Sequence, residues 1–315
     1  NMVFSRKDAV AGLPLTETTL ADVLGKAGYK TGLVGKWHLG AHPRFHPAKR
    51  GFQQIYGFIG GGHDYFDAGN PTAEDQHFIL LERDGEPVTT MDYLTTDLGR
   101  EGAAFVRRNA GSPFFLYLAF NAPHSPLQAP QKYLDRVKHI ADENRRTYAA
   151  MVAAMDDAIG AVLKAIRETR TEQNTLVIFL NDNGGPTGNA SSNYPLRGTK
   201  RTVYEGGVRV PFVMSWPGRL PKGKVYAEPV SGLDVFPTAL AVAGAQAPAG
   251  VQLDGVNILP YLEGKQSFAK PRPFFWRMFG GVYSAVREGR YKLVKNPDSP
   301  VELYDLEKDL GEKEN

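Results

Sequence analysis

The chain has 315 residues, 42% of them hydrophobic and 23% charged, a balance typical of a folded globular protein. Its formal net charge of +3 is too small to indicate a nucleic-acid partner, but it is compatible with an anionic ligand. The absence of cysteine excludes disulfides, thiolate metal sites and a cysteine nucleophile within these residues. The most apolar runs have the length of a strand, so no membrane span is expected.

Helical and strand-like segments alternate along the first half of the chain. Residues 19–27 carry apolar side chains on one helical face, and a threonine can cap the start of this helix. Residues 29–35 then form a short apolar run that is typical of a buried strand. After a loop rich in Gly, Pro and His, residues 94–109 predict a second helix and residues 112–120 a second buried strand.

The same alternation continues in the second half. Apolar residues at helical spacing predict a long helix over residues 142–169, and the run 175–180 predicts a third buried strand. Residues 208–216 predict a fourth strand, and residues 232–244 predict a short helix. After about Lys265, short runs separated by turn residues predict a small antiparallel sheet.

We therefore expect an α/β protein in two parts. Strands that alternate with long helices are typical of a mostly parallel central sheet flanked by helices, which we place in residues 1–265. The short runs of residues 266–315 predict a satellite C-terminal subdomain with an antiparallel sheet.

Polar side chains follow three of the predicted strands. Ligands of open α/β sheets bind beyond the carboxyl ends of the strands, so three such ends in one sheet would share one rim. If the chain stayed extended here, Lys36 and His38 would point to one side and Trp37 to the other, where it would pack. The polar groups are Lys36-Trp37-His38 after the first strand, residues 121–124 after the second, and Asp182-Asn183 after the third.

Asp182 and Asn183 offer hard oxygen donors, the kind that Ca²⁺ and Mg²⁺ prefer. The glycines that follow, Gly184 and Gly185, allow a tight turn that could aim both side chains the same way. The alternative is an Asx turn without a ligand. Because two oxygens are too few for a hard cation, further ligands must come from elsewhere.

Other candidate residues lie in loops. His124 stands between prolines that stiffen its loop, and it is interpreted either as a general acid beside a metal-bound anion or as an ordinary surface histidine. His63 and Asp64 follow three glycines and form either a substrate-side loop or a turn. A glycine-containing loop carries four cations, which suits oxyanion binding or, more commonly, a solvated basic surface. These cations are Arg197, Lys200, Arg201 and Arg209.

Taken together, four segments in this order resemble the sulfatase family, which has an alkaline-phosphatase-like fold. They are "TLADVLGKAGYKTGLVGKWHLG", "NDNGG", "LRGTKRTVYEGGVRVP" and "YKLVKN…VELYDLEKDLGEKEN". Further stretches, among them "PAKRGFQQIYGF" and "HSPLQAPQKYL", are similar to enzymes of the arylsulfatase B type, which remove sulfate from N-acetylgalactosamine units. The resemblance implies a sulfuric ester hydrolase that acts on a sulfated carbohydrate, as a small molecule or polysaccharide, or on an aryl sulfate.

The resemblance also implies a site for a cation and a sulfate. Asp182 and Asn183 would be two of the ligands of a calcium ion, with magnesium as the alternative. Lys36 and Lys200 would hold the sulfate oxygens. A divalent cation and two ammonium groups would offset the negative charge of the ester and stabilise the transition state.

The histidines receive further roles from the same resemblance. His38 would contact the hydroxyl of the nucleophile and help to turn over the covalent intermediate. His124 would protonate the leaving alcohol, which matters because a sugar alkoxide is a poor leaving group. His63 and Asp64 would lie in a loop that faces the substrate sugar.

The first signature of the family, Cys or Ser-x-Pro-x-Arg, is absent from the 315 residues, and so is its N-terminal pair of acidic metal ligands. The Cys or Ser of that signature is converted to the formylglycine nucleophile. We expect this modification upstream of Asn1, and we expect the chain alone to be inactive. The family also implies export to the periplasm or the cell exterior, and the sequence specifies no oligomeric state.

Two other functions stay open. One is a phosphonate monoester hydrolase or phosphodiesterase of the same superfamily, which would use the lysines and the metal in the same way. The other is a non-catalytic protein that binds sulfated glycans through the basic rim.

Overall fold

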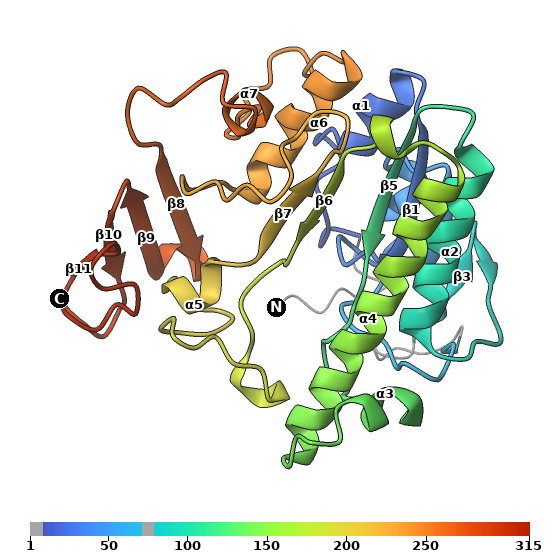
Figure 1. Ribbon diagram of the computed structural model, residues 1–315, viewed down its shortest axis with the longest axis horizontal. Coiled ribbons are helices and arrows are strands. Elements are labelled where there is room, and N and C mark those ends of the chain that lie inside the picture. Colours follow the sequence, from blue (N-terminus) through green and yellow to red (C-terminus); the bar gives the residue numbers. More distant parts are fainter. Residues whose placement is uncertain (1–8, 71–78) are drawn as a thin grey trace. The chain divides into compact units, whose positions relative to one another are not determined.

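The computed structural model describes residues 9–70 and 79–315, which form two compact units (Figure 1). Of the described residues, unit 1 comprises those within Asn1–Glu172 and Val235–Asn257, and unit 2 comprises Gln173–Asp234 and Ile258–Asn315. Each unit has its own sheet structure and its own hydrophobic core, and each is described by itself.

Unit 1 is built on a five-stranded sheet with the order β4-β3-β2-β1-β5. The strand β1 (Lys30–Lys36) runs parallel to β2 (Gln54–Phe58) on one side and to β5 (Phe114–Ala119) on the other. The short strands β3 (Glu82–Arg83) and β4 (Glu86–Pro87) extend the sheet in the antiparallel sense beyond β2. Because β1 and β5 are parallel neighbours, their carboxyl ends lie at the same edge of the sheet.

Helices flank this sheet. They are α1 (Leu20–Lys26), α2 (Leu94–Asn109), α3 (Gln131–Arg136), α4 (Glu143–Glu168) and α6 (Val235–Ala243). Successive residues of a strand point to opposite faces, so Leu33 and Val34 of β1 belong to different cores. Leu33 packs in one core with α1, whereas Val34 packs in another with α2 and α4, which lie side by side in Figure 1.

Two helix starts carry side-chain caps, of which the first is the threonine cap that the sequence indicates. At α1, the Thr19 hydroxyl accepts the N–H of Asp22 at 3.0 Å, and the Asp22 carboxylate accepts the N–H of Thr19 at 2.9 Å. This reciprocal pair is a capping box. At α4, the Asp142 carboxylate accepts the N–H of Arg145 at 2.7 Å, which satisfies one of the free donors of the first turn.

Unit 2 contains two antiparallel sheets. In the first, β6 (Val177–Leu180) pairs with β7 (Phe212–Ser215), and the long loop between them carries the short helix α5 (Glu205–Val208). A further short helix, α7 (Leu259–Leu262), precedes the second sheet, whose order is β11-β10-β9-β8. Its strands are β8 (Pro273–Met278), β9 (Tyr283–Glu288), β10 (Tyr291–Lys295) and β11 (Glu302–Asp305).

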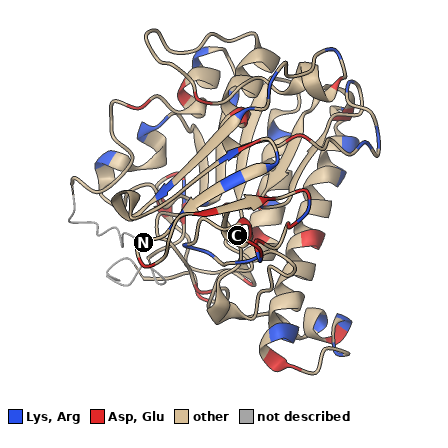
Figure 2. Ribbon diagram, turned by 90° about the vertical axis from the view of Figure 1, so that its left-hand side faces the viewer, with Lys and Arg blue, Asp and Glu red and all other residues tan. Residues whose placement is uncertain are grey.

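This C-terminal sheet carries charges of both signs. In Figure 2 the side of Figure 1 that carries β8 to β11 faces the viewer, and Lys and Arg residues are interspersed with Asp and Glu residues. Such a distribution favours ion pairs between neighbouring elements over one uniformly basic surface. Short 3₁₀ helices occur at Pro43–Phe45, Pro47–Lys49, Glu172–Asn174, Thr187–Asn189, Gly232–Asp234 and Phe279–Gly281.

The predicted fold class is confirmed, since helices flank a central sheet and an antiparallel sheet follows at the C-terminal end. Three details differ from the prediction. The central sheet is mixed, and the strand predicted over residues 208–216 is β7, which pairs antiparallel with β6. Because β6 and β7 form a separate sheet, the three predicted strand ends do not share the rim of one sheet. The strand β2 was not predicted, because Gln54 and Gly57 interrupt its apolar run. The boundary at residue 265 stays a prediction. Across residues 9–70 and 79–315, every helix is too short or too polar to cross a membrane.

Candidate active site

The end of β1 carries Lys36, Trp37 and His38. Lys36 is the last residue of the strand and is half-buried. Trp37 is 5% exposed; its indole Nε1 donates to the carbonyl oxygen of Phe45 at 2.9 Å, and its ring packs edge-on against Phe52. The packing role predicted for Trp37 is confirmed. The predicted alternation is wrong for His38, because its φ of 55° lies in the left-handed region and the extended backbone ends before it.

The loop after β5 fixes both the backbone and the ring of His124. The His124 N–H donates to the carbonyl oxygen of Asn121 at 2.8 Å, and the Tyr65 hydroxyl donates to the carbonyl oxygen of His124 at 2.8 Å. The ring Nδ1 lies 2.8 Å from the carbonyl oxygen of Ser125. Since a carbonyl only accepts, Nδ1 carries a proton, and Nε2 is the ring atom that can exchange a proton with a substrate. This arrangement suits a general acid.

Gln128 joins the loop of His124 to the loop of Asp64. Its side-chain Nε2 donates to Asp64 Oδ2 at 2.7 Å, and its Oε1 accepts the N–H of Tyr65 at 2.8 Å. Tyr65 is fully buried, so both loops are fixed to the same core residue. Sequence reasoning missed Gln128, whose one signal is its place in the proline-bounded segment that begins at His124.

His63 and Asp64 have different surroundings. His63 is fully buried, with Nδ1 2.6 Å from the carbonyl oxygen of Asp64 and Nε2 3.0 Å from that of Ile79. Burial lowers the pKa of His63, although the two carbonyl contacts oppose this shift. Burial alone would raise the pKa of Asp64, but the hydrogen bonds from Gln128 and from the N–H of Phe66 hold it below its usual value. His63 therefore holds its loop, and contact of His63 or Asp64 with a sugar stays a prediction.

In unit 2, the turn after β6 presents two oxygen donors. Asp182 is exposed, and its carboxylate makes no hydrogen bond or ion pair with the part of the chain that the structure describes. The Asn183 amide Nδ2 donates to the carbonyl oxygen of Gly184 at 2.9 Å, which leaves Oδ1 available as a ligand. This donor set fits a hard cation but supplies too few oxygens for one. Within residues 9–70 and 79–315, no three His, Asp or Glu side chains gather as a metal site.

The turn of Asn183 is bonded directly to the loop of Lys200. The Gly184 N–H donates to the carbonyl oxygen of Gly207 at 3.0 Å, and the Lys200 N–H donates to that of Gly185 at 3.2 Å. Asn193 adds a reciprocal pair: Oδ1 accepts the N–H of Gly185 at 2.8 Å, and Nδ2 donates to its carbonyl oxygen at 2.8 Å. The structure therefore brings the predicted cation ligands and the predicted sulfate lysine of this unit together. Sequence reasoning missed Asn193.

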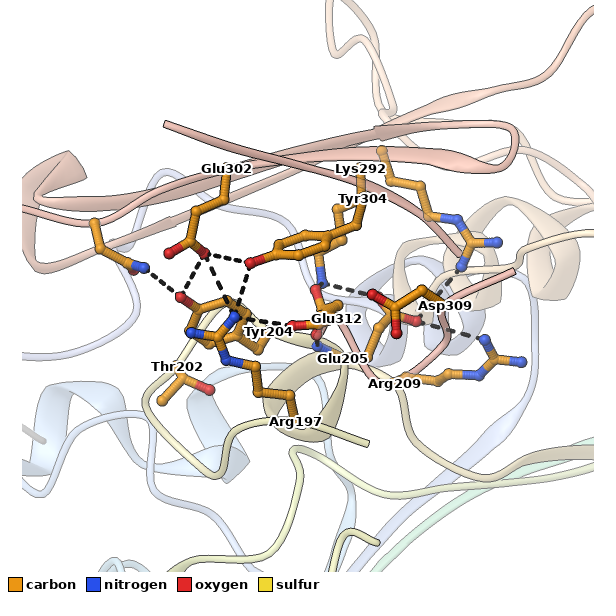
Figure 3. Close-up of polar contacts among 12 residues, drawn as sticks. Arg197, Thr202, Tyr204, Glu205, Arg209, Lys292, Glu302, Tyr304, Asp309 and Glu312 are labelled. Atoms are coloured by element: carbon orange, nitrogen blue, oxygen red, sulfur yellow. Dashed lines mark hydrogen bonds and ion pairs between the residues drawn. The ribbon is translucent and has the colours of Figure 1, made fainter. Parts of the chain in front are cut away.

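Two cations of the loop that carries Lys200 (the lysine loop, residues 196–211) bind other residues of unit 2 (Figure 3). Arg197 donates through Nη1 to the Tyr304 hydroxyl at 2.7 Å, and its guanidinium carbon lies 4.0 Å from the centroid of the Tyr204 ring. The Arg209 Nη1 lies 3.5 Å from Glu205 Oε2. Both guanidinium groups are therefore paired within the protein. The other two cations of the loop, Lys200 and Arg201, remain the candidates for binding an oxyanion.

The sequence matches two family models. One, described as Sulfatase, matches residues 1–245. The other, described as N-sulphoglucosamine sulphohydrolase, C-terminal, matches residues 198–315. Together the two matches cover the whole chain.

Curated relatives are similar along most of this chain. It is 34% identical to N-acetylgalactosamine-6-sulfatase from Homo sapiens, with coverage of 92% of this chain and 56% of the relative. It is 35% identical to arylsulfatase J from Mus musculus, with coverage of 89% of this chain and 47% of the relative. The chain thus spans about half the length of the curated relatives it matches.

Solved structures are similar over almost the whole chain. The crystal structure of Ps i-CgsB in complex with k-i-k-neocarrahexaose has a TM-score of 0.93 and 36% identity, with coverage of 99% of this chain and 72% of that chain. The PsFucS1 sulfatase from Pseudoalteromonas sp. has a TM-score of 0.83 at 24% identity, with coverage of 98% and 71%. The second likeness shows the fold alone.

Proposed function

The chain belongs to the sulfatase family, and from this premise we propose that its protein hydrolyses the sulfate esters of a carbohydrate. The observation that carries the proposal is the direct hydrogen bonding between the turn of Asp182 and Asn183 and the loop of Lys200. Hard oxygen donors beside an ammonium group suit an anion that binds together with a cation. The 36% identity to a structure that holds k-i-k-neocarrahexaose supports a carbohydrate as the substrate.

Asp182 and Asn183 are the proposed ligands for calcium, with magnesium as the alternative, and further ligands complete the coordination. When bound, such an ion supplies positive charge next to the sulfate group. Lys36 and Lys200 bind sulfate oxygens and offset the charge that would otherwise repel a nucleophile. A lysine suits this task, because its ammonium is a compact charge with three donors.

The two histidines handle protons in this proposal. His38 exchanges a proton with the hydroxyl of the nucleophile, which we expect to be a formylglycine. His124 gives the proton on Nε2 to the bridging oxygen as the bond between this oxygen and sulfur breaks. The contact of its Nδ1 with the Ser125 carbonyl oxygen and the hydrogen bond from Tyr65 support this role, because they fix the ring and its backbone.

Hydrolysis of matched esters tests the proposal. The full protein, expressed from its gene, should turn over para-nitrophenyl sulfate and a sulfated galactose oligosaccharide with calcium present. The controls are para-nitrophenyl phosphate, which has the same leaving group as para-nitrophenyl sulfate, and a phenylphosphonate monoester, which has a leaving group of similar size. A higher kcat/KM for the phosphorus esters would favour a phosphonate monoester hydrolase or phosphodiesterase. Tight binding of the sulfated oligosaccharide without turnover would favour a glycan-binding protein.

A further inference from the structure

We propose that Lys292, on β10 of the C-terminal sheet, is a positioning residue for the turn that carries Asp182 and Asn183. The proposal rests on the proposed function, in which this turn binds a cation, and adds a residue that touches neither the cation nor the substrate. Three successive contacts within unit 2 connect Lys292 to the turn, and they pass through Glu205 and Gly207 of α5.

The first contact is a buried ion cluster (Figure 3). Lys292 is fully buried, and its Nζ lies 2.8 Å from Glu205 Oε1 and 3.0 Å from Glu312 Oε1. Glu312 Oε2 also accepts the backbone N–H of Glu205 at 2.7 Å. Burial raises the pKa of Glu312, although Lys292 opposes the shift. Lys292 and Glu312 therefore hold Glu205 by its side chain and by its backbone.

The second contact passes along α5. Glu205 is the first residue of this helix, and Gly206 and Gly207 come directly after it. A Cβ on Gly206 would lie 2.3 Å from the carbonyl oxygen of Gly198, and one on Gly207 would lie 2.3 Å from that of Thr202. Backbone packed this closely against backbone moves as one body, so a shift of Glu205 moves both glycines.

The third contact joins α5 to the turn of Asp182 and Asn183, here called the cation turn. The Gly207 carbonyl oxygen accepts the N–H of Gly184 at 3.0 Å, and Gly184 directly follows Asn183. The Asn183 amide in turn donates to the carbonyl oxygen of Gly184, so the orientation of its Oδ1 depends on this residue. Displacement of Glu205 is thereby transmitted to the ligand oxygen of Asn183.

Lys292 is the main anchor of Glu205 because the alternatives are weaker. The helix α5 has four residues and no side-chain cap, so it is too short to hold its own position. The Nη1 atoms of Arg209 and Arg287 lie 3.5 Å and 3.7 Å from Glu205 Oε2, longer than the contact with Lys292. Arg209 is also 48% exposed, and solvent weakens such a pair.

Calcium binding by the full protein tests the proposal directly. Lys292→Met fills a similar volume but leaves Glu205 and Glu312 buried without their ammonium partner, which loosens α5. We expect calorimetry with calcium chloride to give an affinity that is lower by about tenfold or more, as when an outer partner of a metal ligand is removed. The matched control is Lys295→Met, an exposed lysine on the same strand, which should leave the affinity unchanged.

Hydrogen exchange separates positioning from a general loss of stability. In Lys292→Met, the amides of Gly184 and Lys200 should exchange faster, because their acceptors lie in the loosened loop or turn. The amides of β1 and β5 should keep their protection. The milder Glu312→Gln removes one charge and retains an acceptor for the Glu205 N–H, so we expect a smaller change in the same direction.

Unchanged calcium affinity together with unchanged exchange at Gly184 and Lys200 in Lys292→Met would overturn the proposal. If Lys292→Met does not fold, the same unchanged result in Glu312→Gln overturns it instead. Asp182→Ala distinguishes this outcome from a failure of the proposed function. Calcium affinity that survives Asp182→Ala rejects the cation site itself, whereas hydrogen exchange still decides whether Lys292 positions the turn.

Discussion

A Cβ on Gly184 would lie 1.8 Å from the carbonyl oxygen of Gly206, far inside van der Waals contact. The φ of Gly184 is not positive, so its backbone conformation is open to any residue. The neighbouring loop, and not the turn itself, therefore requires glycine here. This close approach is what lets the turn of Asn183 form its hydrogen bond to Gly207.

We expect Gly184→Ala to separate the cation turn from the lysine loop. The added methyl group would force backbone to move against backbone, which costs about 1–3 kcal/mol of unfolding free energy. Urea denaturation and calcium calorimetry measure the two effects. The control is Gly188→Ala, where an added Cβ meets nothing within 4 Å. Equal stability and equal calcium affinity in the two variants would contradict the close packing of the two segments.

Local signals allowed most elements to be predicted. The helices α2 and α4 have long apolar stripes, which depend only on residues within the segment. An apolar run such as β6 carries no information about its neighbour, so its antiparallel pairing with β7 could not be predicted. The side to which the His38 side chain points could not be predicted either. Alternation of side chains assumes an extended backbone, and the backbone leaves the extended conformation at this residue.

The candidate ligands could be named from the sequence, but the buried residues that we propose to hold them in place could not. In the segment "YKLVK", the apolar pattern favours burial of Leu293, yet Leu293 is 40% exposed and Lys292 is fully buried. A lysine is buried only when partners satisfy its charge, and here the partners are Glu205 and Glu312. Glu205 lies 87 residues away along the chain, so no local pattern could reveal the cluster.

Asp182→Ala should remove most of the proposed sulfatase activity of the full protein. The carboxylate of Asp182 is a proposed calcium ligand, and even outer partners of metal ligands cost about 10- to 100-fold in affinity or activity when removed. Excess calcium should restore little, because the proposed site then lacks both an oxygen ligand and the negative charge that offsets the charge of the ion. Rates on para-nitrophenyl sulfate at increasing calcium concentration measure this. Activity like that of the control Asp254→Ala, which removes an exposed carboxylate, would refute the assignment.

His124→Ala should affect esters according to their leaving group. A sugar alkoxide needs a proton as it leaves, so we expect a loss of about 100-fold or more on a sugar sulfate. A nitrophenolate leaves without a proton, so the loss on para-nitrophenyl sulfate should be much smaller. Steady-state kcat/KM for both substrates gives the comparison, with the exposed His139→Ala as the control. Equal losses on the two esters would argue against a general acid at this position.

The ion pair between Arg83 and Glu101 should make the stability of unit 1 depend on pH. Two N–H groups of Arg83 donate to the two oxygens of Glu101 at 2.7 Å, and this hydrogen bonding lowers the pKa of Glu101 below its usual value of 4.5. A lowered pKa in the folded state means that the pair stabilises the protein above the usual value and stops doing so as the pH falls through the lowered one. Because Arg83 is 46% exposed, we expect Glu101→Gln to cost about 1 kcal/mol at neutral pH and close to nothing in acid. Urea denaturation of both proteins across this pH range measures the difference, with the exposed Glu86→Gln as the control. A difference that is the same at neutral and acidic pH would mean that the charge of Glu101 does not contribute.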